Sequence, residues 1–305
     1  MTDTIQDTSD VVAEAKAWLE ENWDPDLTVA EWWERLGLAG WAAPALPTNA
    51  YGRGLSRNDA VQVQAAIAEH GALPAPGGLG VMLAAPTIAK HGTQEQVEEY
   101  VKPIVTGQRA WCQLFSEPAA GSDLAGLQCR AEQDGEEWIV NGQKVWTSGG
   151  HVADLGMLIA RTDSEVPKHQ GITYFAIDMH QEGIDVRPLR EMTGRALFNE
   201  VFLDNAVARD DAMIGGKNNG WAVANSTLMF ERASLGSGGG STAASSATPG
   251  TVVGDLEKRA GDFVGRRRQG GSNFGGVVKG LRDLAVANGT AAEPTIRQDL
   301  MRLHT

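Results

Sequence analysis

The chain has 305 residues, of which 42% are hydrophobic, and this is enough to bury a sizeable core in two or three domains. Its formal net charge of −13 at pH 7 argues against a nucleic-acid surface, because phosphate contacts need clustered Lys and Arg. The one basic cluster is Arg266 to Arg268, which is typical of a solvated helix face. The six histidines show no ligand spacing, so we expect no metal centre.

The sequence gives no sign of export or of membrane insertion. The acidic, amphipathic N-terminus lacks the basic and apolar regions of a secretory signal. Apolar runs such as Val81 to Ala85 are far shorter than the roughly 20 residues that cross a bilayer. Cys112 and Cys129 provide no disulfide framework, which fits a reducing compartment. We therefore expect a cytoplasmic protein without a membrane span, in which both cysteines are buried strand residues rather than nucleophiles.

Residues 1–108 carry the pattern of a helical domain. Their apolar residues recur at intervals of three and four, which is the spacing of one helix face. Ser56, followed three residues later by Asp59, predicts the N-cap of a helix that runs to His70.

Residues 109–215 have a different pattern, which predicts a β domain. Short runs rich in Val, Ile, Trp and Thr alternate with Gly, Asp and Asn. The dipeptide Asn141-Gly142 lies between two strand-like runs, and Asn-Gly is the strongest short signal for a hairpin turn. We expect a middle domain built as a β-barrel or sandwich, with a hairpin at this dipeptide.

Residues 216–305 return to helical patterns. A helix is expected from Gly220 onward, followed by a loop in the Gly- and Ser-rich residues 236–250. Residues 251–268 and 294–305 again have helical patterns, and the last one ends mid-pattern. The expected fold class is α+β, with an N-terminal helical domain, a middle β domain and an incomplete C-terminal helical bundle.

Two short segments carry the functional signal. Residues 113–124 read QLFSEPAAGSDL, and about 25 residues later residues 141–148 read NGQKVWTS. In this order and spacing the pair resembles the two flavin-site signatures of the acyl-CoA dehydrogenase family. The resemblance extends from about residue 30 to residue 235 and is thinner beyond.

The resemblance implies an FAD cofactor. A flavin presents a polar ring edge, and neutral hydroxyls and backbone N–H groups suit it without adding charge. By similarity, the Ser148 hydroxyl meets flavin N5 and the Trp146 indole packs against the isoalloxazine. Taken singly, Ser116-Glu117-Pro118 would be read as a turn and Trp146 as a hairpin aromatic; the paired motifs favour the flavin. The implied cofactor-binding residues are Gln113, Phe115, Ser116, Gly121, Ser122, Trp146 and Ser148.

A third landmark is Gly220-Trp221 followed by Phe230-Glu231-Arg232. It resembles the helix that carries the catalytic glutamate in isovaleryl-CoA dehydrogenases and some relatives. The resemblance implies that Glu231 is the catalytic base and that Ser122 and Arg232 contact the substrate. The structural alternative is that Glu231 pairs with a neighbouring helix and Arg232 is a surface charge.

The family activity would be α,β-dehydrogenation of an acyl-CoA thioester to the trans-2-enoyl-CoA. The resemblance also implies that electrons pass to an electron-transfer flavoprotein and that the protein is a homo- or hetero-oligomer, a dimer or tetramer. Small residues after Arg232 would admit a bulky acyl group such as a steroid side chain.

Departures from the family pattern leave two other functions open. The family's Arg-x-x-Phe-Gly segment is absent, and the chain ends inside what resembles the second bundle helix. The first alternative is therefore a non-catalytic or half-site partner subunit of a heteromeric dehydrogenase, since actinobacterial family members of steroid and lipid catabolism pair unlike subunits. The second is a flavin oxidase or monooxygenase on the same fold.

Overall fold

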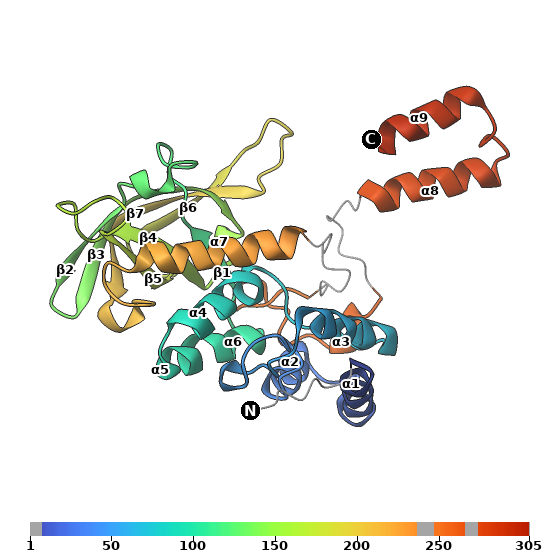
Figure 1. Cartoon of the computed structure of the whole chain (residues 1–305), viewed down its shortest axis with the longest axis horizontal. Coiled ribbons are helices and arrows are strands. Elements are labelled where there is room, and N and C mark those ends of the chain that lie inside the picture. Colours follow the sequence, from blue (N-terminus) through green and yellow to red (C-terminus); the bar gives the residue numbers. More distant parts are fainter. Residues whose placement is uncertain (1–7, 237–246, 266–273, 305) are drawn as a thin grey trace. The chain divides into compact units, whose positions relative to one another are not determined.

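The computed structural model describes residues 8–236, 247–265 and 274–304, and the chain divides into two compact units at Arg266 and Arg267. In the larger unit, helices come first, a seven-stranded sheet follows, and one long helix comes after the sheet (Figure 1). This confirms the expected α+β class. No helix within the described ranges is long and apolar enough to cross a membrane.

The N-terminal region is helical, as expected. Its helix starts are capped by side chains: the Ser56 hydroxyl accepts a hydrogen bond from the backbone N–H of Asp59, which confirms the predicted cap. Thr28 and Glu31 form a reciprocal capping box at the next helix upstream. The elements are α1 (Thr8–Asn22), α2 (Val29–Leu38), η1 (Thr48–Ala50), α3 (Arg57–His70), η2 (Gly80–Ala84), α4 (Ala85–His91), α5 (Gln94–Gln96), η3 (Val97–Val101) and α6 (Lys102–Val105).

Tryptophans anchor the core of the helical region. Trp32 and Trp33 of α2 are fully buried, and their indole N–H groups donate to the carbonyl oxygens of Leu73 and Pro74, at 2.7 and 2.9 Å. Because both indole N–H groups are paired, the large apolar rings are buried without a desolvation penalty for the polar atom. Gly107 lies against this core: a Cβ atom there would lie 2.1 Å from the Trp33 ring.

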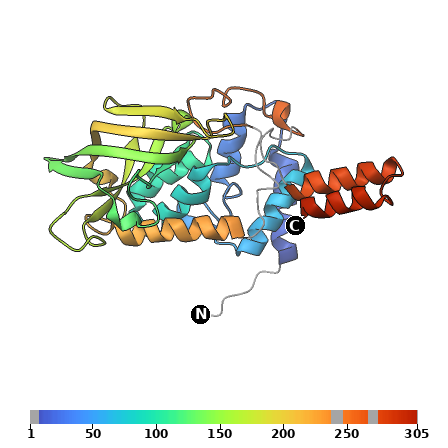
Figure 2. The ribbon, with the colours of Figure 1, turned by 90° about the horizontal axis from the view of Figure 1, so that it is seen from above.

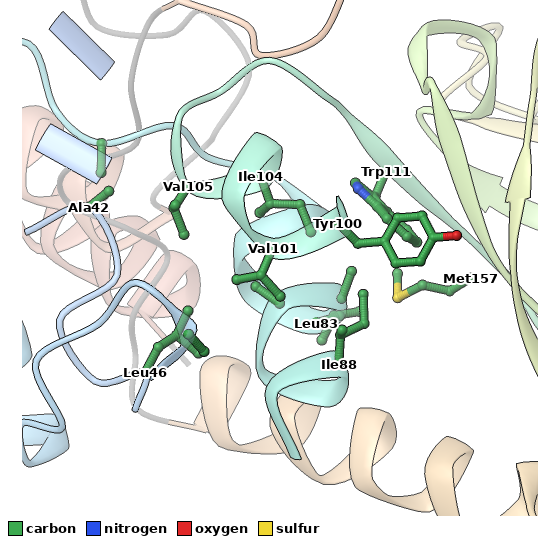
Figure 3. Close-up of a cluster of buried hydrophobic side chains, with 14 of the residues drawn as sticks. Ala42, Leu46, Leu83, Ile88, Tyr100, Val101, Ile104, Val105, Trp111 and Met157 are labelled. Carbon is green, nitrogen blue, oxygen red and sulfur yellow. The ribbon is translucent and has the colours of Figure 1, made fainter. Parts of the chain in front are cut away.

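The same core continues to the sheet. Figure 3 shows side chains of η2, η3 and α6 gathered around Trp111 and Met157, which come from the strands. Leu83, Val101 and Ile104 are each at most 2% exposed in this cluster. Burying each such side chain contributes roughly 1.5 to 3 kcal/mol, so helices and sheet are joined by one continuous apolar core.

The middle region is a single curled sheet rather than two stacked sheets. Its strand order is β1-β4-β2-β3-β7-β6, with β5 paired to β4. β1 and β2 run parallel to β4, and the other pairs are antiparallel. The strands are β1 (Trp111–Leu114), β2 (Arg130–Asp134), β3 (Glu137–Ser148), β4 (Leu155–Arg161), β5 (Ile172–Asp178), β6 (Ile184–Leu189) and β7 (Phe198–Arg209), with 3-10 turns at η4 (Leu124–Gly126), η5 (Gly150–Val152) and η6 (Asp210–Ala212).

The hairpin expected at Asn141-Gly142 is wrong. β3 runs through this dipeptide without turning, and the turn lies earlier, where Gly135 has a left-handed backbone between the paired residues Asp134 and Glu137. Gly142 serves close packing instead, because a Cβ atom there would lie 2.7 Å from the Cα of Cys129. The strand-like runs on both sides of Asn-Gly are therefore one long strand.

After the sheet, α7 (Gly220–Gly236) begins where a helix was expected. It packs against β5, η2 and α4, and Figures 1 and 2 both show it alongside these elements. Most of the predicted loop at 236–250 lies outside the described residues.

Residues 247–265, called the strap from here on, do not form the expected α-helix over 251–265, and residues 266–268 of that prediction lie outside the described residues. They hold one 3-10 turn, η7 (Ala260–Phe263), and are otherwise irregular, with residues 256–261 running along residues 25–30. The backbone N–H of Val29 donates to Lys258 O at 2.8 Å, and that of Ala260 donates to Leu27 O at 2.7 Å. These backbone hydrogen bonds replace the ones that a helix would have made.

The second unit is a pair of helices, α8 (Phe274–Ala287) and α9 (Pro294–His304), which contact each other. The predicted helix near the end of the chain is confirmed. Pro294 stands at its first position, where the missing N–H costs nothing. Leu284, Val286 and Met301 are each more than half exposed, so this unit carries apolar surface.

Both cysteines are buried, as expected. Cys112 lies in β1, and burial raises the pKa of its thiol to about 12. Cys129 lies just before β2, and burial also raises the pKa of its thiol. The thiolate is the reactive form, so neither side chain is suited to act as a nucleophile at neutral pH.

Gly107→Ala is expected to lower the free energy of unfolding by about 3 kcal/mol. Both the left-handed backbone, with φ of +70°, and the contact with Trp33 contribute to this loss. Gly71→Ala is the matched control, since its φ is +79° but no atom lies within 4 Å of its Cβ position. We expect a cost of about 1 kcal/mol there. Urea unfolding of both variants measures the difference, and equal costs would mean that Trp33 is not packed against Gly107.

Candidate functional site

The fold brings the two signature segments together. The first leaves β1 and turns at residues 117–120, and the second forms the last part of β3. The backbone N–H of Val145 donates to Ser116 O at 2.9 Å, so the two segments are in direct backbone contact. Segments separated by about 25 residues in sequence are therefore neighbours in the structure.

A buried ion pair fastens this junction. Lys144 Nζ donates to Glu117 Oε1 at 2.8 Å and to Phe115 O at 3.1 Å, and its side chain is fully buried. Glu117 also accepts the backbone N–H groups of Gln128 and Cys129, at 2.7 and 2.9 Å. A buried charge is tolerated when it is paired and hydrogen-bonded, and here the Glu117 carboxylate has three donors and the Lys144 ammonium has two acceptors.

The first segment then presents small residues at the surface. Glu117 and Ala120 exchange two backbone hydrogen bonds, which closes a tight turn directly before Gly121 and Ser122. Both of these residues are exposed, and no atom lies within 4 Å of the Cβ position of Gly121. The turn leaves backbone and hydroxyl groups open to a ligand.

The second segment presents a tryptophan on a β-bulge. The pairing of β3 with β7 shifts by one residue between Lys144 and Thr147, and Trp146 has a left-handed φ of +62°. The indole is 58% exposed and meets the Phe198 ring edge-on, with the centroids 5.8 Å apart. A bulky residue in this conformation is unusual, and it projects an aromatic face out of the sheet.

Asn199 supports the bulge from β7. It is buried, and its Nδ2 donates to Thr147 O at 2.9 Å and lies 3.3 Å from His151 Nδ1. The neighbouring Ser148 is exposed, whereas Thr147 is buried. Trp146 and Ser148 therefore face outward on either side of a fixed Thr147.

The predicted cofactor residues fall into two groups. The outer group, Gly121, Ser122, Trp146 and Ser148, is exposed on the two joined segments. The inner group is half-buried or buried: Gln113, Ser116 and Phe115. The Phe115 ring packs edge-on against Tyr174 with the centroids 5.9 Å apart, so its side chain supports the junction. An exposed indole beside neutral hydroxyls and an open glycine fits a planar, polar-edged ring such as a flavin.

Glu231 and Arg232 lie near the end of α7. Glu231 follows Thr227 by one turn, on the helix stripe that also holds the buried residues Val223 and Ala224. It is half-buried, whereas Arg232 is exposed. Within the described residues, no ion pair neutralises the Glu231 carboxylate. In the described part of the chain, no hydrogen bond or ion pair joins the Glu231 side chain to the signature segments directly, and its link to them runs through α7.

Sequence reasoning missed the partners that hold these residues. Lys144 was read as part of a motif, yet it continues the two-residue alternation of Trp138 and Val140 on the buried face of β3. That alternation could have predicted a buried lysine, and therefore a carboxylate partner. No local signal could have shown that Asn199, more than 50 residues away, caps the Thr147 carbonyl.

Comparisons with known proteins agree with this arrangement. Residues 3–108 match the acyl-CoA dehydrogenase N-terminal domain, and residues 112–206 match the acyl-CoA dehydrogenase middle domain. The chain belongs to the acyl-CoA dehydrogenase family. Together the two matched domains span the helical region and the sheet, and both signature segments lie in the second of them.

Similar family members come from mycobacteria and from solved complexes. The chain is 47% identical over 203 residues to the acyl-CoA dehydrogenase FadE34 of Mycobacterium tuberculosis; the match covers 67% of this chain and 28% of that protein's length. The solved Tcur3481-Tcur3483 steroid ACAD has a TM-score of 0.68 and 27% identity, over 97% of this chain and 71% of that one. The ChsE4-ChsE5 complex of Mycobacterium tuberculosis has a TM-score of 0.66 and 25% identity, over 100% and 74%.

Removing one partner of the buried ion pair is expected to destabilise the protein strongly. Lys144→Met should lower the free energy of unfolding by roughly 3 kcal/mol, since Glu117 keeps two backbone donors. Glu117→Leu should cost more, up to roughly 5 kcal/mol, because it strands the lysine and both N–H groups.

The exposed pair of Lys168 and Asp123, 2.8 Å apart, provides the control. Lys168→Met should cost less than about 1 kcal/mol, because water screens exposed charges. Denaturant unfolding of the three variants measures the loss in free energy of unfolding for each, and we expect the loss to be largest for Glu117→Leu and smallest for Lys168→Met. Glu117→Leu milder than Lys144→Met would contradict the hydrogen-bond pattern described here.

Proposed function

We propose that the chain catalyses FAD-dependent α,β-dehydrogenation of an acyl-CoA thioester to the trans-2-enoyl-CoA, with the electrons passed to an electron-transfer flavoprotein. The observation that carries the proposal is the union of the two signature segments around the Lys144–Glu117 pair. This union fixes an outward-facing Trp146 and Ser148 beside the open turn at Gly121 and Ser122. Such a surface suits a flavin better than a polyanion, because its exposed groups are neutral.

The outer residues of the two segments would hold the cofactor. Trp146 would stack on the flavin ring, and the hydroxyls of Ser122 and Ser148 would donate to its polar edge. Gln113, Phe115 and Ser116 would support the inner side of the same surface. Bound FAD would supply the two-electron acceptor for the hydride that leaves the β-carbon of the substrate.

Glu231 would act as the base that removes the α-proton. The α-proton of a thioester is weakly acidic, so the carboxylate must be held close to it in a site shielded from water. Its position on the inward stripe of α7, half-buried and without an ion-pair partner in the described chain, supports this role. Arg232 and Ser122 would contact the acyl-CoA, and Glu231 would take the proton.

A second candidate function is that of a half-site or non-catalytic subunit. It is favoured by the ChsE4-ChsE5 complex and the Tcur3481-Tcur3483 steroid ACAD, whose names each join two proteins. In that case the chain would contribute Trp146 and the Gly121 turn to a flavin site completed by another subunit. Flavin binding that appears only after a second chain is added would favour this candidate.

Glu231→Gln tests the proposed base. The purified chain is mixed anaerobically with a panel of acyl-CoA thioesters, and bleaching of the visible flavin absorption is recorded. The glutamine variant should keep its flavin spectrum but bleach at least about a hundredfold more slowly, since a positioned base contributes that much. Glu98→Gln, on a different element and exposed, should bleach at the wild-type rate. Unchanged bleaching in Glu231→Gln would assign the proton transfer elsewhere.

Trp146→Gly tests the flavin surface separately from folding. The free energy of unfolding should stay within about 1 kcal/mol, since relief of the left-handed backbone offsets the lost contact with Phe198. Affinity for FAD should fall about tenfold, because the stacking partner is gone. Val61→Ala, which removes an equally exposed apolar side chain from α3, should leave FAD affinity unchanged. Fluorescence titration with FAD measures the affinity of each variant. An affinity of Trp146→Gly equal to that of the wild type would mean that Trp146 does not contact the flavin.

A further inference from the structure

Three buried hydroxyl groups meet where α7 crosses the sheet and α4. Thr87 of α4 and Thr227 of α7 are fully buried, with their Oγ1 atoms 2.9 Å apart. Thr227 Oγ1 also lies 3.4 Å from the hydroxyl of Tyr174 on β5 and 3.3 Å from Val223 O, one turn back in α7. A hydroxyl has one proton and two lone pairs, so these three contacts saturate Thr227.

We infer that Thr87, Thr227 and Tyr174 are positioning residues that set the rotation and height of α7, and thereby the place of the Glu231 carboxylate. The inference rests on the proposed role of Glu231 as the base. Glu231 follows Thr227 by four residues, which is about 6 Å along the axis and nearly the same helix face. Any rotation of α7 at Thr227 therefore moves the Glu231 side chain with it.

Hydrogen bonds can fix this helix in a way that its apolar contacts cannot. Apolar side chains such as Val223 and Ala224 keep most of their burial when a helix slides or rotates slightly, because the hydrophobic effect has no direction. A buried hydroxyl pair at 2.9 Å breaks under the same displacement, and the buried Thr87 hydroxyl then loses its partner, whereas Thr227 keeps its contact with Val223 O in the same helix. The hydroxyls therefore select one setting of α7.

The contacts extend from the helix to the first signature segment. The Tyr174 side chain is fully buried, and burial raises the pKa of its hydroxyl, so it stays a neutral hydrogen-bonding group at any working pH. Its ring meets Phe115 edge-on, and Phe115 O accepts the Lys144 ammonium. Glu231 and the signature segments are thus tied to the same residue, Tyr174 of β5.

Neighbouring contacts hold α7 on both sides of Glu231. Ser226 Oγ lies 3.0 Å from Lys90 Nζ and 2.8 Å from His91 Nε2, both at the end of α4. Beyond Glu231, the Arg57 guanidinium of α3 donates to Ala233 O. Ser226 is buried, but its partners Lys90 and His91, and also Arg57 and Ala233, are half-buried or exposed, whereas Thr87 and Thr227 are both fully buried. The dry pair is therefore the contact with the strictest geometry.

The test uses the full chain and removes the hydroxyl at constant shape. Thr227→Val is compared with Thr227→Ser, which keeps the hydroxyl, and with Thr106→Val as a matched control. Thr106 is a buried threonine of the helical region whose hydroxyl donates to Lys102 O, away from α7. Two quantities are measured: the rate constant and half-saturating concentration of substrate bleaching, and hydrogen exchange of the amides of residues 228–234.

We expect Thr227→Val to lower the bleaching rate constant about tenfold at an unchanged half-saturating concentration, and to speed exchange in residues 228–234 about tenfold. Thr227→Ser should restore both, and Thr106→Val should change neither. Thr87→Val combined with Thr227→Val should fold at least as stably as Thr227→Val, because the Thr87 hydroxyl is no longer left unpaired, yet should stay slow.

Wild-type bleaching and exchange in Thr227→Val would overturn the inference, as would equal effects in Thr106→Val. The proposed function fails by a different result, namely unchanged bleaching in Glu231→Gln. If the wild-type chain does not bleach with any thioester, the exchange of residues 228–234 decides the inference alone. Faster exchange in Thr227→Val, reversed in Thr227→Ser, would support it, and equal exchange would sink it.

Discussion

The arrangement of the candidate site depends on one charged contact in a dry place, the ion pair between Lys144 and Glu117. It connects the turn of the first signature segment, the start of β2 and the bulge of β3, because Glu117 also binds the backbone of Gln128 and Cys129. The ion pair contributes more to selecting one arrangement of these segments than to net stability, since a buried pair gains little over an apolar replacement of both partners. An apolar replacement would, however, leave the bulge held by backbone pairing and by Asn199, without the directional contacts of Lys144.

The residues of the site are held in place in two different ways. Trp146 and Ser148 are carried by a sheet, where ladder hydrogen bonds and Asn199 fix each residue on both sides. Glu231 is carried by a helix that could slide on its apolar face, and buried hydroxyls limit that freedom. The sheet residues and the helix are connected at β5, where Tyr174 contacts Phe115 on one side and Thr227 on the other. A ligand lying between the sheet surface and α7 would therefore contact two elements that are both held in place by Tyr174.

Local signals in the sequence carried much of this fold. The α3 cap at Ser56, the change from helix to strand pattern and the two signature segments were all readable, because each depends on residues close in sequence. The errors arose where distant contacts overrode a local signal. Asn141-Gly142 reads as a turn, yet β3 continues there because the glycine lets Cys129 approach. The strap reads as a helix, yet its backbone pairs with residues 25–30 instead.

The strap also constrains the order in which the protein can be made. The backbone partners of residues 25–30 are more than 220 residues downstream, around Lys258 and Ala260. Closing so long a loop is slow, and during synthesis it must wait until the ribosome has released residue 261. Until then the edge of the helical region near Val29 has unpaired backbone groups and uncovered apolar surface. The helical region thus emerges before residue 261 but is completed only after it, and newly made chains would be most exposed to chaperones at this edge.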